Sequence, residues 1–241
     1  MRVRAVGKSA FGCYLMWQAV KAKRTVVYIS DKAPTWAVAY PDGRVEAYDK
    51  AFFLHSFAPL CDPQTVLIYD GDGKGDGSKP PVNLPATVVL ITSPKRSRYK
   101  DFELEGGLRL TFPVFSRAEI TDLWRACYAT LPEKGVWERF GKWGGIPRFV
   151  FKRLALVQQR LLERAATAID ASQLPVLLGS EEIEKEDANS HRIFHLKPQG
   201  ETLDGLVNAT EAESYVVVRT EPASEYTATM LFKALDAAAD A

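Results

Sequence analysis

The sequence has few cysteines, almost no net charge and no long apolar run, and each shortage excludes a class of protein. Its three cysteines, Cys13, Cys61 and Cys127, are odd in number and lack C-x-x-C spacing, which indicates neither a disulfide framework nor a zinc site. A formal net charge of +1 gives no global attraction to nucleic acid or membrane, so any such surface must be a local patch. No run approaches the ~20 apolar residues of a membrane-spanning helix.

Helix-like and strand-like segments alternate along the chain and predict an α/β protein. The 241 residues, 46% hydrophobic and 25% charged, suffice for one large α/β domain or for a domain with a smaller second one. Apolar residues have helical spacing over 9–23, and the apolar run over 25–30 is typical of a strand buried on both faces. Helix followed by short strand is the order that a βαβ unit requires. Residues 36–48 alternate around Pro41-Asp42-Gly43, which predicts a β-hairpin at the sheet edge.

Gly7, Lys8 and Ser9 match the end of a P-loop, G-x-x-x-x-G-K-[ST]. In that motif backbone amides surround phosphates, the lysine contacts the β and γ oxygens, and the hydroxyl binds Mg²⁺. The tripeptide opens the predicted helix, whose positive N-terminal end attracts phosphate. The pattern is incomplete because Arg2 stands where the first glycine belongs. The other interpretation is a chance tripeptide at the start of an ordinary helix.

Two further apolar strands end in polar residues that suit a phosphate and magnesium site. Residues 65–70 end in Asp70, as a Walker B strand does, although a buried strand that ends in a turn aspartate also occurs without this role. The apolar run over residues 86–93 predicts a third buried strand with Ser93 at its tip. Asp72, in the glycine-rich loop that follows, is the nearest candidate for a base that orients water; a solvated loop carboxylate is the alternative.

Residues 95–100 form a basic cluster, which is either a solvated patch or a contact for phosphate or nucleic acid. Residues 108–113 have the pattern of another strand. Ser116, three residues before Glu119, then predicts a capping box at the start of a helix.

Gly144-Gly145-Ile146-Pro147-Arg148 predicts a tight turn and then a helix, with Arg148 near its start. A lid helix that brings an arginine to a nucleotide couples hydrolysis to domain motion in many ATPases; a plain helix-turn-helix with a surface arginine is the alternative. Residues 151–169 predict one long amphipathic helix. His191 and His195 fall on one side of a predicted strand and lack metal-site spacing, so we expect them to be structural.

The order of these segments resembles the ATPase region of Crinkler effectors and of the related trypanosome retrotransposon hot spot (RHS) proteins. The resemblance covers about residues 7–218, and its most specific stretches are Gly-Gly-Ile-Pro-Arg at 144–148 and Ser-His-Arg-Ile-Phe-His at 190–195. The other matching stretches are Gly7-Lys8-Ser9-Ala10-Phe11, Ile68-Tyr69-Asp70-Gly71, Ile91-Thr92-Ser93-Pro94 and Phe112-Pro113-Val114-Phe115-Ser116.

This resemblance implies an α/β fold of the P-loop NTPase type (STAND/AAA-like), with a mostly parallel sheet flanked by helices, a helical lid and a small C-terminal α+β segment. We therefore expect a P-loop core over 1–131 with a hairpin insertion over 35–48, a lid over 132–172 and the small region over 173–241. The implied cofactors are ATP and Mg²⁺. By position, we expect nucleotide binding by Gly7, Lys8, Ser9, Ala10, Asp70 and Ser93, Mg²⁺ binding by Ser9 and Asp70, and catalytic roles for Asp72 and the lid residue Arg148.

The function that the resemblance implies is ATP binding and hydrolysis used as a conformational switch. Members of the family often carry a nuclease-like domain, and the oomycete and fungal members are associated with secretion and with host nuclei. The expected partners are a nucleotide and either nucleic acid or a host nuclear protein, with no membrane. The alternative is a nucleotide-inert scaffold that binds a protein or nucleic-acid partner through residues 95–100, and Arg2 in place of the first P-loop glycine favours it.

Overall fold

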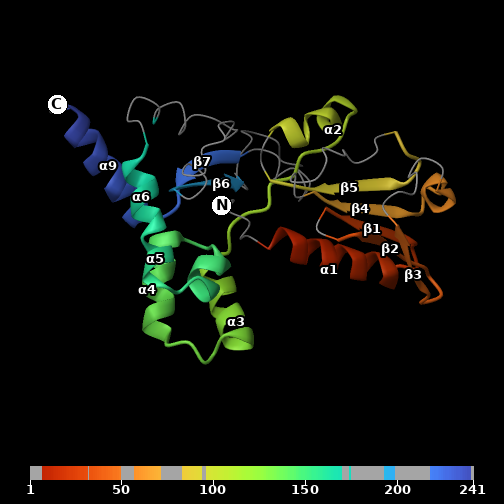
Figure 1. The fold of residues 1–241 in the computed structure, drawn as a ribbon, viewed down its shortest axis with the longest axis horizontal. Helices are drawn as coiled ribbons and strands as arrows, with labels where there is room; N and C mark the ends of the chain where they lie inside the picture. Colours follow the sequence, from red (N-terminus) through yellow and green to blue (C-terminus); the bar gives the residue numbers. More distant parts are fainter. Residues whose placement is uncertain are drawn as a thin grey trace, which may run out of the picture. The chain divides into compact units, whose positions relative to one another are not determined.

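A computed structural model describes residues 7–31, 33–49, 57–71, 83–93, 96–169, 174, 193–198 and 218–239. The described parts belong to two compact units, Gly7–Gly107 and Leu108–Ala241 (Figure 1). The division into a core, a lid and a C-terminal region at 131 and 172 stays a prediction. The first unit contains α1 Lys8–Lys21, β1 Val26–Ser30, β2 Thr35–Ala39, β3 Val45–Asp49, η2 Ala58–Cys61, β4 Val66–Asp70, β5 Thr87–Ile91, η3 Arg96–Arg98 and α2 Lys100–Leu104.

The first unit is built on a five-stranded sheet in the order β3-β2-β1-β4-β5. β1, β4 and β5 are parallel neighbours, whereas β1 pairs antiparallel with β2 and β2 antiparallel with β3. The predicted hairpin is therefore confirmed, and Gly43 in its turn has a φ of 89° that favours glycine. Because the hairpin adds two antiparallel strands, the sheet is mixed rather than mostly parallel.

Helix α1 covers one face of β1, β4 and β5 and runs antiparallel to them (Figure 1). Near its start, a Cβ added at Gly12 would lie 2.8 Å from Ile91 Cδ1, so the helix approaches the C-terminal half of the strands closely. Beyond its other end, Arg24 donates to the Gln64 carbonyl at 2.7 Å and to Thr87 Oγ1 at 3.1 Å, where β4 and β5 begin. The N-terminus of α1 therefore lies at the edge where the parallel strands end.

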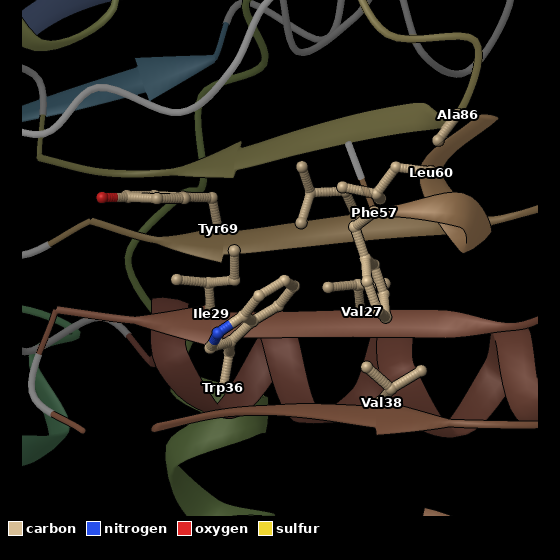
Figure 2. Close-up of a cluster of buried hydrophobic side chains, with 9 residues drawn as sticks. Val27, Ile29, Trp36, Val38, Phe57, Leu60, Tyr69 and Ala86 are labelled. Carbon is tan, nitrogen blue, oxygen red and sulfur yellow. The ribbon is translucent and has the colours of Figure 1, made fainter. Parts of the chain in front are cut away.

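The opposite face of the sheet buries a second apolar cluster. Figure 2 shows Trp36 and Phe57 in contact above the strands, with ring centroids 5.0 Å apart, and Leu60 close by. The Trp36 indole also donates to the Asp49 carbonyl at 2.7 Å, which fixes the ring against the hairpin. Burying each large apolar side chain contributes about 1.5–3 kcal/mol, so this cluster holds the hairpin on the parallel strands.

The second unit is mainly helical. Its elements are α3 Arg117–Cys127, α4 Glu133–Trp143, η4 Arg148–Lys152, α5 Leu156–Gln159, α6 Leu161–Thr167, β6 Phe194–Pro198, β7 Val218–Pro222 and α9 Glu225–Ala239. The capping box is confirmed: Ser116 Oγ accepts from the Glu119 amide at 3.3 Å, and the Glu119 carboxylate accepts from the Ser116 amide at 2.7 Å. β6 and β7 pair antiparallel, and His191 lies outside the described residues.

Two predictions for this unit are wrong. Residues 108–113 form neither helix nor ladder, and Leu108 and Leu110 are 66% and 54% exposed. The single helix predicted over 151–169 is divided into η4, a π-helical turn, and the short helices α5 and α6. The break is stabilised by Gln159, whose side-chain amide donates to the Arg153 carbonyl at 2.6 Å. A backbone carbonyl that would continue a long helix is bonded there to a side chain instead.

Candidate functional site

The candidate site lies where the C-terminal ends of β1, β4 and β5 meet the first turn of α1. Gly12 packs over Ile68, and Asp70 lies two residues further along the same strand, on the same face. Two strand residues span about 6.6 Å, and one helical turn before Gly12 spans about 5.4 Å in the same direction. Lys8 and Ser9 are therefore placed above the end of β4 that carries Asp70.

The N-terminus of α1 has the features of an anion site. Gly7 is the N-cap, with a left-handed backbone (φ 84°, ψ 9°) and no side-chain cap. The first amides of a helix have no intrahelical acceptor, and the helix dipole adds positive potential there. The first turn carries no acidic residue, and Lys8 and Ser9 are half-buried at its start. Together, these features suit phosphate oxygens.

Asp70 is a buried carboxylate, only 6% exposed. The Tyr28 hydroxyl donates to its Oδ2 at 3.4 Å from the neighbouring strand β1. Burial raises the pKa of Tyr28 to about 12, with additional contributions from the charges of Asp70 and Cys13. Tyr28 therefore stays protonated at neutral pH and acts as a donor to the carboxylate.

The tip of β5 carries a second polar pair. Arg98 Nη1 donates to Ser93 Oγ at 2.7 Å, which places a guanidinium from the basic cluster at the predicted sensor position. On the far side of β4, the Tyr69 hydroxyl donates to Asp31 Oδ1 at 3.0 Å. The edge therefore presents cations from α1 and η3 and carboxylates from the strand ends.

The structure brings some predicted site residues together and leaves others apart. Gly7, Lys8, Ser9, Ala10, Asp70 and Ser93 all belong to the unit Gly7–Gly107 and to its α1, β4 and β5 ends. Asp72 lies outside the described residues. Arg148 belongs to the other unit, Leu108–Ala241, so its contact with a nucleotide stays a prediction.

Arg148 begins η4 and is half-buried in its own unit. Burial lowers the pKa of its guanidinium, and the neighbouring Arg153 charge lowers it further. Such shifts occur at places that receive an anion, and structural arginines also show them.

The two glycines before Arg148 have a packing role. A Cβ at Gly145 would lie 1.7 Å from the Phe115 carbonyl oxygen, and a Cβ at Gly144 would lie 2.3 Å from the Ala223 carbonyl oxygen. The Phe115 amide donates to the Gly145 carbonyl at 2.9 Å, so the two backbones are in direct contact. The glycines thus join α4 to the segments before α3 and α9, and they fix the start of η4.

Sequence reasoning did not identify Tyr28 or Asp31, and it did not assign Arg98 to the site. Tyr28 lies two residues before the end of a predicted strand, so its alternation places it on the same face as Ser30. That signal becomes useful only when β4 is known to be the neighbour of β1. Arg98 lies in the basic cluster, whose contact with the tip of β5 no local pattern indicates.

The donor set fits a magnesium ion that is held mainly by water and phosphate. Mg²⁺ in nucleotide sites takes one or two protein oxygens, and Ser9 and Asp70 supply a hydroxyl and a carboxylate. Among the described residues there is no group of three His, Cys, Asp or Glu side chains that could enclose a metal. The binding of Mg²⁺ by Ser9 and Asp70 stays a prediction. Within the same described residues, no helix has the length and apolar character needed to span a bilayer.

Comparison with known proteins gives one distant relative. No family model matches the chain, and no solved structure matches it. The chain is 23% identical over 228 residues to Crinkler effector protein 16 of Phytophthora infestans, an alignment that covers 90% of this chain and 34% of that protein. The chain thus spans about a third of the length of this relative. This similarity supports a distant Crinkler-like relationship.

Proposed function

We propose that Gly7–Gly107 is the nucleotide-binding unit of a Crinkler-type protein, which binds ATP with Mg²⁺ and hydrolyses it as a conformational switch. The observation that carries this proposal is the placement of a Gly-Lys-Ser helix start over the buried carboxylate at the end of the adjacent parallel strand. Phosphate-binding loops and magnesium carboxylates occupy these two places in P-loop proteins.

The sheet order gives independent support. β4 and β5 are neighbours, and the outer edge of β5 has no strand partner among the described residues. Since crossover connections between parallel strands are right-handed and α1 spans β1, β4 and β5, a strand that enters α1 would lie beside β5. Some P-loop ATPases have an extra strand between the Walker A and Walker B strands, and its tip carries a polar sensor residue. β5 would be the corresponding strand in this chain. Ser93 occupies that tip.

Each residue then has a specific role. Lys8 and the amides of Gly7, Ser9 and Ala10 would hold the phosphates, and Ser9 and Asp70 would hold Mg²⁺, which offsets charge on the β and γ oxygens. Tyr28 would keep Asp70 oriented and ionised. Ser93 would contact the γ-phosphate, and Asp72 would orient the attacking water. Arg148 would approach the γ-phosphate from the lid.

The similarity to a Crinkler effector supports a second part of the proposal, which concerns where the protein acts. That relative is named an effector, so we propose that this chain also acts as a secreted effector, and that it enters host nuclei as the family resemblance implies. Since the chain spans 34% of the relative, the activity of the whole relative is not transferred to it.

Binding of a fluorescent ATP analogue with and without Mg²⁺ tests the proposal. Lys8→Ala should abolish binding, and Asp70→Asn should remove its dependence on Mg²⁺. Lys21→Ala, at the other end of α1, and Asp62→Asn, beyond the opposite end of β4, are matched controls that should bind normally. Equal binding by the wild type and Lys8→Ala would overturn the proposal.

A nucleotide-inert scaffold is the second candidate, and Arg2 favours it because a large side chain replaces a P-loop glycine. The structure adds that Arg98 is engaged with Ser93, whereas Lys100 is exposed. If this candidate is correct, nucleic-acid binding should survive Lys8→Ala and fall when Arg96 and Arg98 are both replaced by Gln. Loss of ATP binding in Lys8→Ala would decide against it.

A further inference from the structure

The outer face of α1 carries a row of three exposed aromatic side chains. Phe11 is 38% exposed, Tyr14 49% and Trp17 52%. Tyr14 and Trp17 lie on the side of α1 away from Leu15 and Ala19, which pack on the sheet, and Phe11 lies at the margin of that side, one turn before Leu15. Single exposed aromatics are ordinary, but a contiguous row marks an interaction surface. We name Phe11, Tyr14 and Trp17 the aromatic row.

The rings are arranged in succession along the helix. The Phe11 and Tyr14 centroids are 6.2 Å apart with ring planes at 26°, and the Tyr14 and Trp17 centroids are 5.9 Å apart with planes at 38°. Gln18 donates to the Tyr14 hydroxyl, and the Lys21 ammonium lies 4.4 Å from the Trp17 centroid. Neighbouring contacts therefore hold the rings, so little side-chain entropy remains to be lost when a flat ligand stacks on them.

The sequence around the aromatic row carries only positive charges. Residues 1–30 contain six lysines and arginines and no aspartate or glutamate. Lys21 and Lys23 are exposed at the end of α1 nearest Trp17. This local surplus contrasts with the net charge of +1 for the whole chain. An anionic ligand with flat apolar groups is complementary to this surface.

We infer that the aromatic row with Lys21 and Lys23 binds single-stranded nucleic acid. Aromatic side chains stack on unpaired bases, while nearby cations contact the phosphate backbone. Duplex bases are already stacked on one another, so a duplex can use only the cations. A second copy of this chain fits less well because two such faces would bring like charges together. The inference goes beyond the proposed ATP binding, which would use the N-terminus of α1 rather than its outer face.

Fluorescence anisotropy of a labelled oligothymidylate of about 12 nucleotides tests the inference, since such grooves hold roughly 4–16 nucleotides. Trp17→Ala should weaken binding roughly 5- to 150-fold, as expected for the loss of stacking on one base. Trp17→Phe should keep most of the affinity. Phe232→Ala, which removes an aromatic side chain that is 66% exposed on α9, is the matched control and should change nothing.

A charge test and a comparison with duplex complete the experiment. Lys21→Gln with Lys23→Gln should reduce the dependence of the affinity on salt, and an equal length of duplex should bind more weakly than the single strand. Circular dichroism should show the same fold in every variant, since the replaced side chains are exposed. The inference is overturned if Trp17→Ala binds the oligonucleotide as the wild type does, or if duplex binds as tightly as the single strand. It is also overturned if the protein self-associates through the aromatic row in analytical sedimentation and does not bind the oligonucleotide. Lys8→Ala should retain oligonucleotide binding. A failure of the ATP proposal can therefore be distinguished from a failure of this inference.

Discussion

The Tyr28 hydroxyl donates to Oδ2 of Asp70 at 3.4 Å, and this bond connects two neighbouring parallel strands beneath α1. Tyr28 is paired in register with Ile68, so the contact is diagonal and reaches the last residue of β4. It gives a buried carboxylate a donor from within the protein. The bond thus makes the carboxylate less dependent on a metal for its stability in the folded state.

Tyr28→Phe removes this donor and keeps the ring. We expect the free energy of unfolding to fall by about 1 kcal/mol, because the buried carboxylate loses one hydrogen bond. The apparent Mg²⁺ affinity in the presence of ATP should fall by a smaller factor than in Asp70→Asn. Urea denaturation and a Mg²⁺ titration measure the two effects.

Tyr40→Phe is the control for Tyr28→Phe. It also removes a hydroxyl that donates to a carboxylate, that of Glu46 at 3.0 Å, but it does so on the hairpin. It should leave the Mg²⁺ titration unchanged. If the two variants shift that titration equally, Tyr28 has no specific connection with the metal.

The first unit could be predicted well because its signals are local. The apolar runs of β1, β4 and β5 are each bounded by polar or turn residues, and Pro41-Asp42-Gly43 predicts the hairpin. The positions of Lys8 and Asp70 at element ends followed from the same patterns. Tyr28 could not be assigned, since its partner depends on which strand lies next to β1.

The second unit was predicted less well because long-range contacts override local periodicity there. The helix predicted over 151–169 is interrupted where the Gln159 amide bonds to the Arg153 carbonyl, while the Trp143 indole donates to Gln159 Oε1 at 2.8 Å. Gln159 and Arg153 are six residues apart, but Trp143 lies sixteen residues before Gln159 and outside the segment whose periodicity predicts the helix. Residues 108–113 alternate like a strand, but Leu108 is 66% exposed and no described strand pairs with them.

Gly145→Ala should prevent correct folding of the second unit. The added Cβ would lie 1.7 Å from the Phe115 carbonyl oxygen, which is a backbone atom that cannot rotate away. We expect a loss of several kcal/mol, in the range of the most damaging single substitutions. Thermal denaturation and solubility measure the effect.

Gly141→Ala is the matched control for Gly145→Ala. Gly141 lies inside α4, and apart from its chain neighbours and the backbone of its own helix no atom lies within 4 Å of the position of its Cβ. Since alanine favours a helix interior by up to about 1 kcal/mol over glycine, this variant should be slightly more stable than the wild type. Equal stability of the two variants would contradict the close contact at Gly145.

His195 should make the stability of the second unit depend on pH. Burial lowers the pKa of His195 to about 4, and its Nε2 has no hydrogen-bond partner among the described residues. The unfolded chain, with a pKa near 6.5, binds the proton more readily. The free energy of unfolding is therefore highest above about pH 6.5. It falls by up to about 3 kcal/mol as the pH falls toward 4.

His195→Leu tests the assignment of this dependence. The variant has an apolar side chain of similar volume that cannot be protonated. Urea denaturation at several pH values should show a flatter dependence of the unfolding free energy than in the wild type. An unchanged slope would assign the pH dependence to other groups.

Arg148→Gln tests whether the second unit takes part in nucleotide chemistry. Burial and then the charge of Arg153 lower the pKa of the half-buried Arg148 guanidinium, so replacing Arg148 should not destabilise the fold. If Arg148 contacts the γ-phosphate during hydrolysis, turnover should fall roughly 10³-fold or more while ATP binding stays within a few-fold of the wild type. Phosphate release and binding of a fluorescent ATP analogue measure the two quantities, with the exposed Arg164→Gln as the control. Normal turnover in Arg148→Gln would restrict the nucleotide site to Gly7–Gly107, whereas equal losses of binding and turnover would show that the arginine acts on the ground state.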